Sequence, residues 1–307
     1  MKYFDLAADA GSKAQQTQLA NLHLKKGVNW PCLAIILLAT VAYLGVAILL
    51  SDKSIILQLL AGITLGTWLS FTLFCMMHEA AHGNLFAGYK SAGRHNDWVG
   101  HFLGIATLIC YYQFKITHRD HHKHTNDEVE DPNYWAVSKK GWAIAPDIAF
   151  AFAKNRTELS KYSKRTGNTA VLRAYERHWM AALLSLIIAT ALFGMDTVFS
   201  FWILPAILSV AAIFLFFAYL PHGKSVGQDT MNEKIPVYPS IFDPIVDIIS
   251  VGQKYHLLHH RFPRVPCHRL RALKNDLEIS QIDETDATAA AHGAHHKTSP
   301  LKETVTS

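Results

Sequence analysis

Long uncharged apolar runs dominate the chain and predict membrane-spanning helices. Residues 32–50 and 55–77 form one pair of runs, and residues 179–195 and 197–220 form a second pair separated only by Asp196. Each run has about the length needed to cross ~30 Å of hydrocarbon at ~1.5 Å per residue. The pattern therefore predicts an all-α integral membrane protein with four transmembrane helices in two hairpins.

A fifth apolar run, residues 99–114, is of marginal length, and the basic residues indicate how to interpret it. Of the 29 lysines and arginines, all except Lys53 lie outside the short link between the first two runs. Basic residues collect on the cytoplasmic side of membrane proteins, so both termini and residues 115–177 are expected to be cytoplasmic. A further crossing would move residues 115–177 to the other side. We therefore expect residues 99–114 to form a re-entrant or interfacial helix.

Composition supports a membrane protein and divides the chain into three parts. Half of the 307 residues are hydrophobic and 17% are charged. Residues 1–30 are expected to form a cytoplasmic N-terminal segment without a signal peptide, residues 31–279 the membrane domain, and the small, polar residues 280–307 a disordered tail. The net charge of +5 fits contact with anionic membrane lipids or an acidic protein partner. No nucleic-acid motif accompanies it, so a nucleic-acid partner is not expected.

The four cysteines do not form a recognisable pattern. No CxxC pair occurs, and three of the four lie in apolar runs, so the sequence predicts neither a disulfide framework nor a thiolate metal site. They are expected to act as small apolar side chains: Cys32, Cys75, Cys110 and Cys267.

Eight of the 18 histidines lie in three tight groups, the first of which directly follows the second apolar run. Spacings of i, i+3 and i+4 place side chains on one face of a helix, which is a chelating arrangement. His222 follows the last run at a depth that matches that of the first group. The sequence thus predicts one metal-binding cap at the cytoplasmic membrane boundary. The three groups are His78 and His82; His118, His121 and His122; and His256, His259 and His260.

The number of imidazoles favours two metal ions. Neutral imidazole suits zinc, copper, iron and nickel, and geometry decides among them. A tetrahedral zinc site takes about four protein ligands, so eight or nine histidines exceed the needs of one ion. A pair of ions with room for O2 favours iron over copper, and it favours redox chemistry that side chains cannot perform alone.

These motifs resemble those of the membrane fatty acid desaturase superfamily, which includes acyl desaturases and carotenoid hydroxylases. The resemblance covers residues 71–270 and rests on HEAAHG at 78–83, HRDHHKHTNDEVEDPN at 118–133 and GQKYHLLHHRFPRVP at 252–266. It implies a non-haem di-iron centre bound by the eight grouped histidines, with His222 matching an extra ligand position. It also implies O2-dependent oxidation of an unactivated C–H bond in a lipid. The electrons would come from an external ferredoxin or cytochrome-type partner.

This resemblance indicates the metal site and the reaction more clearly than it indicates the substrate. The region from residue 218 to 266 is more similar to desaturase-type β-carotene ring hydroxylases, although Cys267 stands where an aromatic residue is expected. The HEAAHGNLF segment equally suits bacterial-type acyl desaturases. Carotenoid ring hydroxylation is therefore the preferred hypothesis, and fatty acyl desaturation is the alternative.

Five acidic residues lie beside the histidines and could orient ligand imidazoles by accepting their free N–H groups. Asp131 matches the end of the second motif in the resembling family and is the preferred candidate, together with Glu79 in the first motif. Asp127 and Glu128 could equally belong to a solvated loop or cap a helix. The fifth residue is Asp97.

Two rival functions remain open at this stage. The residues from His78 to His82 satisfy HExxH, in which two histidines hold zinc and the glutamate activates water, as in an intramembrane protease. Such a site needs one further ligand rather than six or seven. A metal transporter would require polar residues at bilayer depth, and the apolar runs have almost none apart from Gln58. The remaining histidines are expected to be surface, interfacial or tail residues, except that His101 is expected to be a hydrogen-bonded polar group within an apolar run and His124 to lie adjacent to the site at most.

Overall fold

The computed structural model describes residues 2–5, 13–24, 26–137, 151–219, 234–237 and 242–279. The predicted tail, residues 280–307, and the candidate ligand His222 lie outside this part of the chain.

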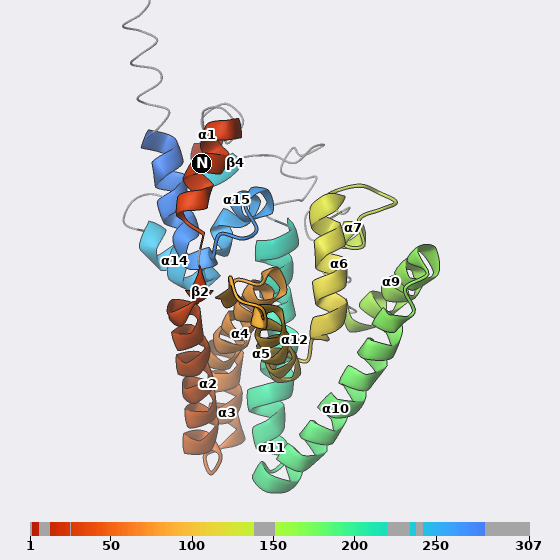
Figure 1. The fold of residues 1–307 in the computed structure, drawn as a ribbon. Coiled ribbons are helices and arrows are strands. Elements are labelled where there is room, and N and C mark those ends of the chain that lie inside the picture. Colours follow the sequence, from red (N-terminus) through yellow and green to blue (C-terminus); the bar gives the residue numbers. More distant parts are fainter. Residues whose placement is uncertain are drawn as a thin grey trace, which may run out of the picture.

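The described chain is mostly helical, as predicted (Figure 1). The helices of the first half are α1 (Lys13–Leu22), α2 (Trp30–Leu50), α3 (Ile55–Ala61), η1 (Gly62–Gly66), α4 (Thr67–His82), α5 (Ala92–Thr107), α6 (Tyr111–Lys123) and α7 (Tyr134–Val137). Those of the second half are α9 (Ala151–Thr166), α10 (Ala170–Phe193), α11 (Met195–Val198), η3 (Phe199–Ile203), α12 (Leu204–Ile213), η4 (Phe214–Tyr219), α14 (Asp243–Ser250), η6 (Gln253–Tyr255) and α15 (His256–Arg261). Helices α2, α4 and α12 run side by side, and α10 slants away from them (Figure 1).

Two short antiparallel strand pairs join segments that are distant in the sequence. Strand β1 (Lys2–Asp5) pairs with β4 (Lys234–Val237), and β2 (Gly27–Val28) pairs with β3 (Phe86–Ala87). The second pair connects the start of α2 to the chain just after α4, so the first span and the first histidine motif are linked through the backbone.

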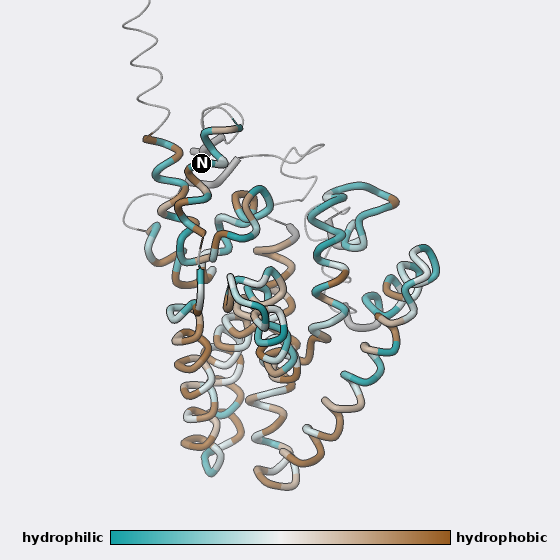
Figure 2. Tube along the Cα trace, in the orientation of Figure 1, coloured by the Kyte–Doolittle hydropathy of each residue, from teal (hydrophilic) through white to brown (hydrophobic). Residues whose placement is uncertain are grey.

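Four helical stretches in the described residues are long and apolar enough to cross a membrane, as predicted. They are Trp30–Leu50, Ile55–His82, Ala170–Phe193 and Met195–Phe217. Figure 2 shows the hydrophobic residues along these stretches and the hydrophilic residues concentrated at one end of the molecule. The chain is therefore an integral membrane protein. The side of the membrane on which each end lies stays a prediction.

Local capping explains where these spans begin and turn. The Asn29 side chain accepts a hydrogen bond from the backbone N–H of Cys32 at the start of α2, next to a proline suited to the first helical turn. Ser54 caps the start of α3 in the same way. Between α10 and α11, Gly194 adopts a φ of 82°, which a residue with a Cβ rarely tolerates. Each hairpin therefore has a tight link at one end.

The two hairpins come into close backbone contact at a π-helical turn within the second span. A Cβ atom on Gly62 would overlap the backbone oxygen of Ser200 in η3. Glycine is therefore needed at position 62 for the hairpins to touch through their backbones.

The apolar run 99–114 is divided between two helices, so the expectation of one helix there is wrong. Helix α5 ends at Thr107, Leu108 adopts a left-handed φ of 56°, and α6 begins at Tyr111. Figure 1 shows α5 nearly end-on, whereas the candidate spans run along the page. Helix α5 exposes the large apolar side chains of Trp98 and Phe102. Its position in the membrane interface stays a prediction.

Helix α4 lies at the centre of the molecule. It packs against α2, α5 and α12, and every side chain from Leu69 to Ala81 is buried. The polar end of the molecule lies over the C-terminal end of α4. There, α6, α15 and the helical residues 267–279 surround the first histidine motif.

Candidate metal centre

The first histidine motif occupies the last turn of the buried helix α4. His78 and His82 are four residues apart, and their rings lie 4.7 Å from each other, centroid to centroid. The helix ends immediately afterwards at Gly83, whose φ of 77° suits a C-terminal cap. Burial of α4 thus places both imidazoles inside the protein at the end of a membrane span.

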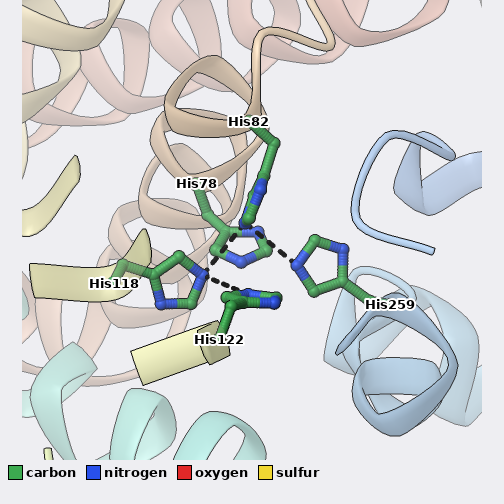
Figure 3. A group of neighbouring side chains, drawn as sticks. All are labelled: His78, His82, His118, His122 and His259. Atoms are coloured by element: carbon green, nitrogen blue, oxygen red, sulfur yellow. Dashed lines mark hydrogen bonds between the residues drawn. The ribbon is translucent and has the colours of Figure 1, made fainter. Parts of the chain in front are cut away.

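Helices α6 and α15 complete a set of five histidines around this turn (Figure 3). The Nε2 atom of His82 lies 3.0 Å from that of His118 and 3.1 Å from that of His259. The Nε2 atom of His118 is also 3.0 Å from that of His122. Each of these histidines offers a ring nitrogen that lies within 4.8 Å of the ring nitrogens of the others. We call them the five-histidine set: His78, His82, His118, His122 and His259.

The other three grouped histidines form an adjacent set. The Nε2 atoms of His256 and His260 are 3.1 Å apart, and the rings of His121 and His260 lie 4.9 Å apart. The ring of His260 stacks on that of His122 at 4.0 Å, so the two sets share a boundary. We call these residues, His121, His256 and His260, the three-histidine set. The structure thus brings all eight predicted histidines together.

The spacing of the ring nitrogens fits metal coordination. Imidazole nitrogens bind ions such as zinc at about 2.0–2.1 Å, which places neighbouring ligands on one ion roughly 3 Å apart. The Nε2 pairs of both sets lie 3.0–3.1 Å apart. Among the described residues, neither ring nitrogen of His78 has a hydrogen-bond partner, although the side chain is fully buried. A bound ion would satisfy such orphaned buried nitrogens.

The protonation of the imidazoles also suits a metal. Burial lowers the pKa values of His118 and His259 well below that of a free histidine, and the neighbouring histidines lower them further. These rings are therefore neutral at physiological pH and keep a lone pair for an ion.

Asp131 orients one of the predicted ligands. Both of its carboxylate oxygens lie 2.9 Å from Nδ1 of His121, which leaves Nε2 of that ring for a metal. The carboxylate is itself fixed by the backbone N–H groups of Asn126 and Asn133. Similarly, the Thr125 hydroxyl lies 3.3 Å from Nδ1 of His260. The structure thus places Asp131 where the sequence suggested.

The other candidate acids have different roles. Asp127 accepts hydrogen bonds from the backbone N–H groups of Glu130 and Val129, and these bonds lower its pKa. Asp97 accepts from the Tyr111 hydroxyl and from Lys115, and Glu128 is exposed. Asp97 and Asp127 therefore stabilise the surrounding helix and loop, and within the described part of the chain none of the three acids is hydrogen-bonded to a grouped histidine.

Glu79 also differs from the expectation that it orients a ligand. Its Oε1 atom lies 3.9 Å from Nδ1 of His78, which is too long for a hydrogen bond. Its Oε2 atom accepts from the Asn84 side chain and from the backbone N–H of Cys267. This fully buried carboxylate is held away from the five-histidine set. The zinc-protease hypothesis, which requires Glu79 to activate a metal-bound water, therefore has no support from the geometry.

The structure places the remaining described histidines outside both sets. His23 pairs with Asp276, His95 lies against the backbone oxygen of Ser91, and Nδ1 of His268 lies 3.6 Å from Sγ of Cys32. His222 lies outside the described residues, so its predicted role as a ligand stays a prediction.

Sequence reasoning missed an aromatic layer that contacts the histidines. The Phe217 ring lies 5.0 Å from that of His78 and 4.7 Å from that of His256, and Phe114 stacks on His118 at 4.8 Å. Phe114 lies one helical turn before His118, and this i, i+4 spacing could have identified it. The layer contacts the histidine sets from the side of the membrane spans.

Comparison with known proteins agrees with this geometry. The model of a family described as fatty acid desaturase matches residues 54–288. A "Beta-carotene ketolase" of Haematococcus lacustris is 24% identical over 229 residues, which cover 72% of this chain and 64% of that protein. A "Beta-carotene ketolase" of a Paracoccus species is 26% identical over 66% of this chain and 74% of that protein. An "sn-1 acyl-lipid omega-3 desaturase (ferredoxin)" of a Synechocystis species is 32% identical over 24% of this chain and 19% of that protein.

Proposed function

The chain belongs to the fatty acid desaturase family and is a membrane oxidoreductase, and from this premise we propose that it uses two iron ions and O2 to oxidise an unactivated C–H bond on a carotenoid ring. The observation that carries the proposal is the gathering of eight histidines into sets of five and three at the end of a buried membrane span. The iron ions, when bound, supply the activation of O2 that protein side chains cannot provide.

Each histidine set would hold one ion. The five-histidine set offers neutral, closely spaced nitrogens from α4, α6 and α15. The three-histidine set would hold the second ion, and Asp131 keeps His121 in the required orientation. His222 matches the extra ligand position that the resemblance implies. Phe114 and Phe217 keep water away from the rings that they cover. These side chains thus hold the metal ligands in a dry, pre-organised site.

The extent of similarity favours a carotenoid over an acyl chain. The regions shared with the two β-carotene ketolases cover 66–72% of this chain, whereas the region shared with the acyl-lipid desaturase covers 24%. Hydroxylation of a ring carbon consumes O2, two electrons and two protons, and it releases one water. A second hydroxylation at the same carbon, followed by loss of water, gives a ketone. We therefore propose ring hydroxylation as the first step, with a keto group as its further product.

The proposal is tested by expression in a host that accumulates β-carotene, followed by mass analysis of pigments and fatty acids. New carotenoids that carry hydroxyl or keto groups, with unchanged acyl chains, are the expected result. The His118→Ala variant is the inactive control. Unaltered pigment beside new unsaturated acyl chains would replace the proposal with acyl desaturation.

The proposal also places both termini and the metal centre on the cytoplasmic side, where an external ferredoxin or cytochrome-type protein would deliver electrons. The distribution of basic residues supports this orientation. Lys53→Cys should react with a membrane-impermeant thiol reagent from outside, and Lys164→Cys should react only after the membrane is opened. The four native cysteines are buried, so they add little background. Labelling of Lys164→Cys from outside would contradict the orientation.

A further inference from the structure

A second cluster of metal-ligating side chains lies beside the histidine sets and is separate from them. Cys32, Glu79 and Cys267 are buried, and each offers a ligand atom within 4.8 Å of the others. The exposed His268 adds a ring nitrogen, Nδ1, at 3.6 Å from Sγ of Cys32. The donors come from the start of α2, the last turn of α4 and the start of the helical residues 267–279.

The chemistry of these donors differs from that of the histidine sets. Two thiols, one carboxylate and one imidazole form a four-ligand set of the kind that zinc accepts. Zinc binds sulfur at about 2.3 Å and nitrogen or oxygen at about 2.0–2.2 Å, so tetrahedral neighbours lie roughly 3.3–3.8 Å apart. The 3.6 Å between Cys32 and His268 falls within this range. The other three donors lie within 4.8 Å of one another, so the ligands would have to move closer together to surround one ion.

The Glu79 carboxylate gives independent evidence for a missing partner. Its Oε1 atom is fully buried and has no hydrogen-bond partner among the described residues. An unsatisfied buried polar atom costs about 1–3 kcal/mol, and more when it is charged. Oε1 lies 3.9 Å from Nδ1 of His78, whereas Oε2 lies beside Cys267; a cation held by the neighbouring thiols would offset the charge of this buried carboxylate.

The surrounding residues fix the carboxylate in position. The Asn84 side chain donates one hydrogen bond to Oε2 of Glu79 and another to the backbone oxygen of Pro263. The backbone oxygen of Asn84 accepts from the Asn29 side chain, which also caps α2. The segments that carry the four donors are thus already connected.

We propose that Cys32, Glu79, Cys267 and His268 bind one Zn²⁺ ion in a structural site. Binding replaces the two thiol protons, which pass to solvent, and no electrons are exchanged. The two thiolates balance the charge of the ion, and the Glu79 carboxylate leaves the site with one net negative charge. The site ties the first span to α4 and to the helix that follows α15. It thereby holds the histidines of α15 against those of α4.

Cobalt substitution of the full-length protein in detergent tests this site. Thiolate ligands give Co²⁺ a sulfur-to-metal charge-transfer absorption that histidine ligands cannot give. We expect this absorption in the wild-type protein, with its loss in Cys32→Ser and Cys267→Ser. It should persist in Cys110→Ser, a buried cysteine elsewhere, and in His118→Ala, which alters only the five-histidine set.

The wild-type protein alone can overturn the proposal, so a variant that fails to fold does not obscure the result. Cobalt bound without any sulfur-to-metal absorption would show that the thiols are not ligands. As a second measurement, one equivalent of zinc should protect Cys32 and Cys267 from alkylation after mild unfolding, and a chelator should remove this protection. Equal alkylation with and without zinc would also contradict the site.

Discussion

The two spans of the first hairpin are both apolar, with mean hydropathies of 2.8 and 1.7, but their surroundings differ. Helix α2 buries only Cys32 and Ala39 along its length, and it exposes side chains such as Leu37. Helix α4 is buried from Leu69 to Ala81 and ends in the first histidine motif. Hydropathy identifies both helices as spans, but it does not indicate which one lies at the centre. Burial on all sides makes the end of α4 a dry place for metal ligands.

The largest effect on activity should come from removing a histidine that lies beside the C-terminal end of α4. His118→Ala removes a nitrogen that lies 3.0 Å from two other ring nitrogens of the five-histidine set. We expect complete loss of product formation in the β-carotene host. His95→Ala is the matched control because His95 lies outside both sets. Normal product from His118→Ala would remove this residue from the proposed centre.

A leucine on each span tests the packing difference directly. Leu69→Ala should lower the free energy of unfolding by about 2–5 kcal/mol, because it leaves a cavity in the core of the protein. Leu37 is 63% exposed, so Leu37→Ala should change it by less than about 0.5 kcal/mol. Denaturation of both variants in the same detergent provides the measurement. Equal losses would show that α2 is packed as tightly as α4.

Asp131→Asn should have an intermediate effect, since Asp131 acts through His121. An amide cannot offer two acceptor oxygens to Nδ1 of His121 and to the two backbone donors. Loss of such an orienting partner lowers metal affinity by about 10–100-fold, and we expect this change in an iron titration. Asp127→Asn is the control, because Asp127 bonds only to backbone N–H groups in the described structure. An unchanged affinity in Asp131→Asn would indicate that His121 is held by other contacts.

The smallest effect concerns the packing of α5 on α6. A Cβ atom on Gly100 would overlap the ring of Tyr111, whose hydroxyl is tied to Asp97 and to the backbone oxygen of Ala80. Gly100→Ala should therefore destabilise the protein by about 1–3 kcal/mol, measured by thermal unfolding. Gly93→Ala on the same helix meets no atom within 4 Å and should be neutral or slightly stabilising. Similar stability of both variants would contradict this packing.

Features with a local signal could be predicted from the sequence. Uninterrupted apolar runs predicted four candidate spans, because a helix in hydrocarbon needs a continuous apolar surface. Helical spacing within each motif predicted which histidines share a face, and the family resemblance indicated that the motifs meet. Asp131 was identifiable because it lies only ten residues from His121.

Features that depend on distant contacts could not be predicted. The division of the run 99–114 depends on Leu108 in a left-handed conformation, which no local residue preference indicates. Likewise, the cysteines were expected to be apolar fillers, yet Cys32 and Cys267 meet Glu79 across most of the chain length. No spacing rule relates residues that only the tertiary fold brings together.

The metal content of the purified protein tests the central claim most directly. Protein produced in iron-rich medium and purified in detergent would be analysed for all transition metals, with His118→Ala prepared in parallel. The proposed function predicts close to two iron ions per wild-type chain and a clear loss of iron in the variant. Wild-type protein that binds zinc but no iron would contradict the di-iron centre.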